Sequence, residues 1–220
     1  MSDVTITVRG EHEARVAPER ATIRVTVRAE GPARASVVDL ALRLAEPLRQ
    51  SITERSDAGS VVDWSSKRLS VRAERPWNSE GKRLAPVYHA SVDFTATFTE
   101  ASELSLWVSD VSAWDGVEMG WVNWHLTPDT RARVEREVAA AAVGVAVTRA
   151  EAYAGALGRS SVSPIEIADV GLISNREAAP AQPMLKARGA AFAAAGSSPG
   201  MEYEPEEIVV SATVEGRFLA

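Results

Sequence analysis

The stretch GWVNWHLT, residues 120–127, gathers two tryptophans and a histidine, the residue types best suited to chemistry in this chain. A histidine beside aromatic rings can act in catalysis, bind a metal or line a ligand pocket. The alternation of the stretch is instead typical of a strand with two faces. Val122, Trp124 and Leu126 share one face, and Trp121, Asn123 and His125 share the other. We expect the first face to be core and the second to be an interaction face.

Gly120 and the local density of tryptophan support this division. Gly120 is a candidate β-bulge that would return Met119 to the Val122 face. Four tryptophans fall in 107–124, and each ring can bury roughly 150–250 Å². Such rings are expected in the core, at an oligomer interface or on a pocket wall. For Trp121 and His125 we favour an interface, and the alternative is a small-molecule-binding or enzymatic module with a tryptophan-lined cleft.

No other group of residues predicts a catalytic, cofactor-binding or metal site. His12, His89 and His125 lie in different elements, and none has a second ligand at metal-binding spacing along the chain. GSSPG, residues 196–200, matches the letters of a serine-hydrolase elbow but lacks its flanking strand and helix. Acidic residues between 202 and 207 are expected to be a solvated charge run. We therefore expect no enzyme and no cofactor.

The composition of the chain further limits the kinds of site and partner that we expect. The 220 residues contain no cysteine, which excludes disulfides and thiolate metal sites. The net charge is −6, and no run of lysine or arginine forms a phosphate-binding stripe, so nucleic acid is not an expected partner. The first residues lack the pattern of a signal peptide, and no apolar run approaches the ~20 residues of a membrane span. We expect a cytoplasmic chain without membrane insertion.

Hydrophobic spacing predicts an α+β fold, with helices packed on antiparallel sheet. Strands are predicted at about 4–8, 21–27, 61–75, 87–98, 120–127, 162–173 and 208–219. Helices are predicted at about 31–55, 101–110 and 128–157. The order is ββαββ, then αβαββ, and the first two strands are expected to join through the turn at 17–19. Pro47 predicts a kink near 43–47 or two helices meeting there.

The long helix has the clearest ends. Thr127 is a candidate cap, Pro128 suits the first turn, and Gly158 suits the stop. The segment 174–207 lacks a pattern and is expected to be a long flexible loop. We expect a single domain over residues 1–220, with possible subdomains at 1–99 and 100–220.

Four stretches in this order resemble the SIMPL domain family along nearly the whole chain. They are ITVRGEHEARVAPERATIRVTVRAEG, YHASVDFTATFTEASELSLWVSDV, WHLTPDTRARVEREVAAAAVGVAVTRAEAYAGALG and PGMEYEPEEIVVSATVEGRF. They look like the family's opening strands, its aromatic strand with a small helix, its capped long helix, and its final strand after Pro-Gly and an acidic patch. Many bacterial members carry an export signal, which we do not expect here because the first residues lack its pattern.

The resemblance implies an α+β domain whose biochemical role is undefined, with no established catalytic residues. It also implies a tendency in some bacterial members to form large oligomers, and associations with stress tolerance, the cell envelope or signalling partners. We expect a non-enzymatic protein that acts by self-association as a homo-oligomer and by contact with a protein partner.

Overall fold

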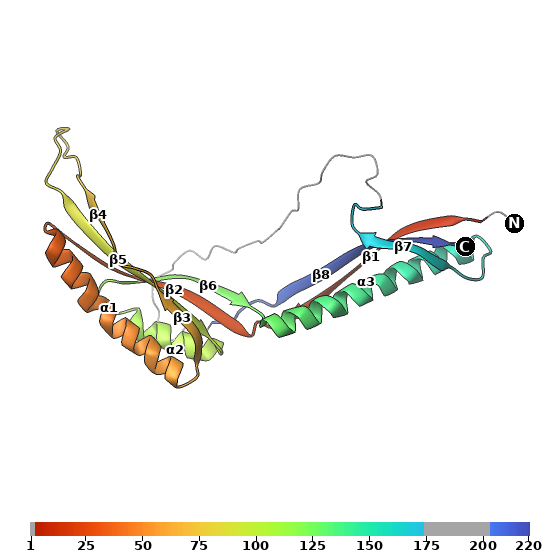
Figure 1. Ribbon diagram of the computed structural model, residues 1–220, viewed down its shortest axis with the longest axis horizontal. Helices are drawn as coiled ribbons and strands as arrows, with labels where there is room; N and C mark the ends of the chain where they lie inside the picture. Colours follow the sequence, from red (N-terminus) through yellow and green to blue (C-terminus); the bar gives the residue numbers. More distant parts are fainter. Residues whose placement is uncertain (1–2, 174–202) are drawn as a thin grey trace. The chain divides into compact units, whose positions relative to one another are not determined.

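The computed structural model describes residues 3–173 and 203–220, which form two compact units (Figure 1). The described part of the first unit comprises residues 3–17, 127–173 and 207–220, and that of the second comprises 18–126 and 203–206. Both units place helices on antiparallel sheet, so the predicted α+β class is confirmed. The units differ from a division at residue 99 because the first strand pairs with the last one.

The first unit is a three-stranded antiparallel sheet with one long helix along it. Strand β8 (Ile208–Leu219) lies between β1 (Thr5–Val16) and β7 (Ser163–Asp169). Helix α3 (Pro128–Ala156) packs on β1 and β8, as Figure 1 shows. The Thr127 hydroxyl accepts a hydrogen bond from the Thr130 amide at 3.4 Å, and Gly158 has a φ of +73°. The predicted long helix and both of its end signals are confirmed.

Small side chains let α3 lie close to the sheet. Its buried stripe, at a spacing of four residues, is Val134, Val138, Ala142, Ala146, Ala150 and Ala154. A Cβ atom on Gly10 of β1 would lie 2.0 Å from the Ala142 carbonyl oxygen and 2.6 Å from the Ala146 amide nitrogen. The absence of a side chain at Gly10 therefore sets the distance between helix and strand.

The second unit is a five-stranded sheet with two helices on one face. The strands are β2 (Arg20–Gly31), β3 (Val61–Ser66), β4 (Ser70–Glu74), β5 (Val87–Phe98) and β6 (Val117–His125). Their order is β3-β5-β2-β6, and β4 also pairs with β5. Helices α1 (Arg34–Asp57) and α2 (Ala101–Val111) cover the same side of this sheet (Figure 1).

Trp107 of α2 is the largest fully buried side chain in the described core. Its ring centroid lies 5.2 Å from that of Phe98, and its indole N–H donates to the Ser51 hydroxyl at 3.0 Å. Leu104, Trp107 and Val111 of α2 have no exposed surface, so one side of this helix faces the core.

Three details differ from the expectations from sequence. The first two strands join through residues 17–19 as expected, but they do not pair with each other, because β1 pairs with β8 while β2 pairs with β5 and β6. The strand predicted over 61–75 is two strands, since the register against β5 shifts by one residue between Ser66 and Ser70. Helix α1 continues through Pro47, so the alternative of two helices is also wrong.

Most of the segment 174–207 lies outside the described residues, as does GSSPG at 196–200. Among the helices that the structure describes, none has the length and apolar character needed to cross a membrane.

Candidate functional site

Strand β6 carries the candidate interaction face, and a β-bulge determines which of its side chains lie there. Ile23 of β2 pairs with Val122, and Val25 pairs with Met119, so Arg24 lies opposite both Gly120 and Trp121. A Cβ atom on Gly120 would lie 2.7 Å from the Arg24 carbonyl oxygen, which explains the glycine. The bulge expected at Gly120 is therefore present, and it returns Met119 to the core side as the alternation required.

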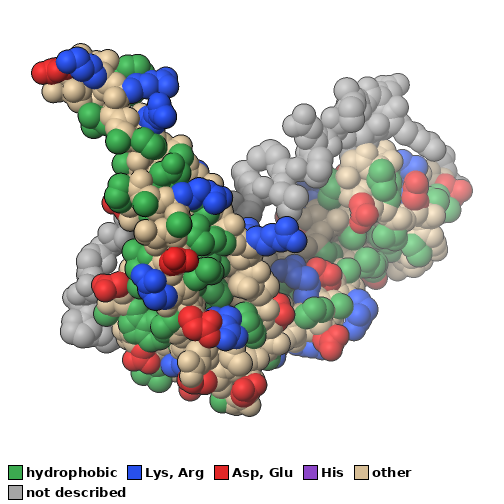
Figure 2. Space-filling model, turned by 60° about the vertical axis from the view of Figure 1, so that its left-hand side comes forward, with side chains coloured by type: hydrophobic (Ala, Val, Ile, Leu, Met, Phe, Trp, Pro, Cys, Tyr) green, Lys and Arg blue, Asp and Glu red, His purple; other side chains and the backbone are tan. Residues whose placement is uncertain are grey.

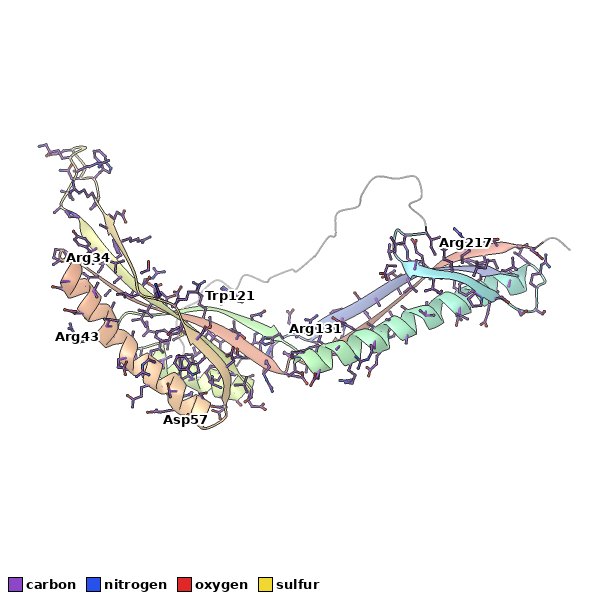
Figure 3. The ribbon with its side chains drawn as sticks, viewed as in Figure 1. Arg34, Arg43, Asp57, Trp121, Arg131 and Arg217 are labelled. Atoms are coloured by element: carbon purple, nitrogen blue, oxygen red, sulfur yellow. The ribbon has the colours of Figure 1, made fainter. Side chains whose placement is uncertain are left out.

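The two tryptophans of β6 lie on opposite faces of the sheet. Trp124 packs against the core, and its ring meets the Tyr203 ring edge-on at a centroid distance of 5.9 Å. Trp121 is 68% exposed and lies on the side away from α1 and α2 (Figure 3). Trp124 is therefore part of the core, and Trp121 is mostly exposed to solvent.

Tyr203 also packs beside Trp124, a contact that the sequence did not predict. Its amide N–H donates to the Ser105 hydroxyl at 3.0 Å, and burial raises the pKa of its phenol. These contacts hold the chain just before β8 against α2 and Trp124. Nothing in the local sequence signals this role, because Tyr203 stands almost eighty residues beyond Trp124 among proline and glutamate.

Asn123 and His125 share the exposed side of β6 with Trp121. Asn123 is exposed and pairs in register with Thr22, and His125 is partly buried and pairs with Arg20. The His125 Nδ1 atom lies 3.2 Å from the Asn123 carbonyl oxygen, so the ring is held against its own strand. The three residues predicted to form one face thus lie together along the edge strand of the sheet.

Polar pairs between β2, β3 and β5 continue this surface, which we call the polar face. The Thr22 and Thr97 hydroxyls are 2.8 Å apart, as are those of Ser65 and Thr95. At the centre, Asp93 accepts from the Arg24 guanidinium and, at 2.8 Å, from the Thr26 hydroxyl. The Lys67 ammonium lies 3.9 Å from the same carboxylate. Cross-strand pairs of this kind stabilise a sheet and leave its polar groups satisfied.

The environment of Asp93 is unsuited to proton transfer. The hydrogen bond from Arg24 is the main reason that the pKa of this carboxyl is lowered, and the Thr26 hydroxyl and the charges of Arg24 and Lys67 add to it. Burial opposes the shift in pKa without reversing it. A carboxylate held in its ionised form by a guanidinium is a weak base at neutral pH. Asp93 is therefore a structural residue of the polar face.

Asp93→Asn should destabilise the second unit at pH 7 by about 1 kcal/mol, since a hydrogen bond to a charged group is lost and Arg24 is partly exposed. The pKa of Asp93 is lower in the folded state, so its ionisation stabilises the fold above the unfolded pKa of about 4. That contribution is lost as the pH falls through the lower, folded pKa. Urea denaturation between about pH 7 and pH 3 should show the difference between wild type and variant shrinking in acid. An undiminished difference at the lowest pH would contradict this assignment.

The histidines do not build a metal centre within residues 3–173 and 203–220, where no group of three potential ligands meets. His12 lies on β1, and His125 lies on β6 of the other unit. His89 contacts Glu30 through Nδ1 at 3.5 Å and Glu74 through Nε2 at 3.8 Å. Because the two carboxylates face opposite ring nitrogens, they cannot share one ion with the imidazole.

Two shallow hollows stand out in the described surface, one in each unit. The first has a volume of about 430 Å³ and lies beside Val4–Thr7 and the end of α3. The second has a volume of about 220 Å³ and lies between α1 and the neighbouring strands. Neither is lined by Trp121 or His125.

Comparison with protein families matches residues 6–218 to SIMPL, described as a protein of unknown function (DUF541). The chain belongs to the SIMPL family. A search of curated proteins gave no match. The match confirms the resemblance found in the four sequence stretches and covers both units of the structure.

In this SIMPL chain, the connection between β4 and β5 forms a basic arm over residues 75–86. The Arg83 guanidinium carbon lies 4.9 Å from the centroid of the Trp77 ring, and Trp77 and Arg83 form a β-bridge. Trp77 is 62% exposed, and Figure 2 shows Lys and Arg side chains gathered at the end of this arm. The contact of Arg83 with Trp77 depends on the turn geometry of this arm.

Proposed function

We propose that this SIMPL-family protein acts without catalysis, by self-association and by contact with a protein partner. We assign the surface that contacts another protein chain, either a second copy or a partner, to Trp121, Asn123 and His125 on β6. One observation carries this proposal. Trp121 is 68% exposed on the outer face of β6, whereas Trp124, on the opposite face of the same strand, packs against the core.

Trp121 has the properties of an interface anchor. A tryptophan that becomes covered can bury roughly 150–250 Å², and tryptophan is enriched among the residues that dominate binding energy. The surrounding polar groups already have partners, as in the pairs Asp93 with Arg24 and Glu118 with Arg28 at 3.1 Å. Another chain can therefore cover this face without leaving those charges unpaired.

The chemistry of the face also supports a role without catalysis. Asp93 is held as a carboxylate by Arg24, and the His125 ring contacts its own strand. An acid–base catalyst instead needs a group free to exchange its proton with a substrate. The groups on this surface are arranged to pair with one another, which is the arrangement of a contact surface.

Trp121→Ala should weaken self-association, or binding to a captured partner, by about tenfold or more, which corresponds to the loss of an anchor worth about 1.4 kcal/mol or more. The free energy of unfolding should change by no more than about 0.5 kcal/mol, because the side chain is mostly in water. Sedimentation velocity over a range of micromolar concentrations measures the first effect, and urea denaturation measures the second.

Trp77→Ala is the matched control, since Trp77 is 62% exposed in the same unit but belongs to the basic arm. It should leave association unchanged. Equal association of wild type and Trp121→Ala would remove the assignment to this face. A protein that is monomeric at every concentration would remove self-association from the proposal.

A further inference from the structure

In the part of the chain that the structure describes, no strand lies beside the outer edge of β1. Val4 and Ala220 exchange both main-chain hydrogen bonds, at 3.1 and 2.9 Å. In an antiparallel pair such residues alternate with residues whose N–H and C=O point the other way. The uninterrupted register of β1 with β8 therefore directs the main-chain groups of Thr5, Thr7 and Arg9 to the free edge of the sheet.

Most of this edge is protected against pairing. The Arg149 guanidinium of α3 donates to the Arg9 carbonyl oxygen at 2.7 Å. Beyond Arg9, the residues whose main-chain groups face outward are charged and exposed: Glu11, Glu13 and Arg15. The Arg15 guanidinium lies 3.6 Å from the Glu13 carboxylate. Charged side chains on an edge strand disfavour the addition of another strand. Among the described residues of this edge, the uncharged segment Val4–Val8 remains open to another strand.

An apolar hollow lies beside this open segment. It is lined by Val4–Thr7 and by Tyr153, Ala156 and Leu157 of the last turns of α3. Tyr153 is 53% exposed and Leu157 is 59% exposed. These two residues follow Arg149 at a spacing of four, so the helix face that covers the edge at Arg9 becomes apolar beside Thr5 and Thr7.

The open segment reads the same in both directions, as Val-Thr-Ile-Thr-Val. We propose that a second copy of this chain adds its own segment Val4–Val8 to the edge of β1, antiparallel, with the twofold axis at Ile6. Thr5 then exchanges main-chain hydrogen bonds with the partner's Thr7, and Asp3 lies opposite the partner's Arg9. This inference rests on the self-association in the proposed function and names one contact that produces it.

Side chains and charge agree with this register. Asp3 is exposed. The Arg9 guanidinium lies 3.4 Å from the Glu215 carboxylate of its own chain and keeps 52% of its side chain exposed, so an Asp3–Arg9 pair can flank the axis on each side. The twofold operation extends the sheet as β7-β8-β1 followed by the partner's β1-β8-β7. It also places both α3 helices on one face, where Tyr153 and Leu157 of each copy approach those of the other. An isologous contact of this kind closes as a dimer.

The absence of cysteine permits a test of the register in solution. Thr5→Cys and Thr7→Cys proteins, one carrying a mass tag, are mixed and oxidised mildly. Residues opposite each other in a hydrogen-bonded pair have Cα atoms about 5.5 Å apart, within the range of a disulfide, whereas diagonal neighbours about 7–8 Å apart lie outside it. The mixture should form the mixed disulfide dimer at least about tenfold faster than Thr5→Cys alone.

A mixture of Glu11→Cys and Glu13→Cys is the matched control, because these residues have the same spacing and edge but lie outside the palindrome. It should not cross-link above background. Thr7→Pro provides a second variant: its N–H faces the free edge, where proline is tolerated, and the dimer dissociation constant should rise about tenfold or more. Glu13→Pro should leave that constant unchanged.

The outcomes separate this inference from the proposed function. Self-association without the mixed disulfide, or unaffected by Thr7→Pro, overturns the β1 contact and leaves the proposed function in place. A protein that is monomeric by sedimentation overturns the β1 contact and removes self-association from the proposed function. Cross-linking of the first mixture alone, together with weaker association of Thr7→Pro, supports the β1 contact.

Discussion

Gly10→Ala should destabilise the first unit by about 3 kcal/mol or more, at the upper end of the effects of overpacking. The added methyl group would meet the Ala142 carbonyl oxygen at 2.0 Å and the Ala146 amide nitrogen at 2.6 Å. Because both are main-chain atoms, no side-chain rotation relieves the contact, and the helix must move away from β1. Hydrogen exchange of the α3 amides measures this effect locally and should become much faster.

Gly144→Ala is the matched control on the facing helix. Outside its chain neighbours and its own helical turns, no described atom lies within 4 Å of a Cβ placed at Gly144, so the substitution adds helix propensity without a clash. It should slow exchange in α3 and stabilise the helix by about 1 kcal/mol. Equal exchange rates in Gly10→Ala and wild type would show that α3 does not pack on β1 as closely as described.

Trp107→Ala should destabilise the second unit by about 3–5 kcal/mol, the range for removing a large aromatic side chain from a core. The indole has no exposed surface, packs on Phe98 and donates to the Ser51 hydroxyl. Its loss leaves a cavity between α2 and the sheet and also removes the hydrogen bond that joins α2 to Ser51 of α1. Urea denaturation followed by the fluorescence of the remaining tryptophans measures the change.

Leu106→Ala tests whether this effect belongs to the buried side of α2. Leu106 precedes Trp107 but is 64% exposed, so its replacement should change the free energy of unfolding by about 0.5 kcal/mol or less. Similar losses in the two variants would contradict the assignment of Trp107 to the core.

Sequence periodicity predicted the elements well wherever one face is buried and the other is not. Strand β5 alternates buried Ala90, Val92 and Phe94 with polar neighbours, and the structure has the same alternation. Helix α3 carries local end signals at Thr127 and Gly158, so its bounds were predictable within a residue. On β6, alternation together with the glycine bulge was enough to separate Trp121 from Trp124.

Strand partners were not predictable in the same way. The alternation of β1 indicates a strand with one buried face, but pairing with β8 joins residues about two hundred positions apart. Local sequence carries no information about a contact between residues so far apart in the chain. The short turn at 17–19 instead suggested that β1 and β2 are neighbours in one sheet. The approach of Tyr203 to Trp124 and the interaction of Arg83 with Trp77 likewise depend on chain positions that only the fold brings together.

Side-chain chemistry was predictable in kind but not in arrangement. The sequence places Arg24, Asp93 and Lys67 on strands, but their convergence follows from the register of β2 and β3 against β5. Once they converge, the lowered pKa of Asp93 follows from ordinary electrostatics. The same applies to the free edge of β1, where the palindrome is visible in the sequence and its exposure is not.

The most direct test of the central claim is the mass of the wild-type protein in solution, measured by light scattering across micromolar concentrations. The account predicts a mass above the 23.5 kDa of one chain that rises with concentration as copies associate. A mass that stays at that of one chain throughout would contradict it.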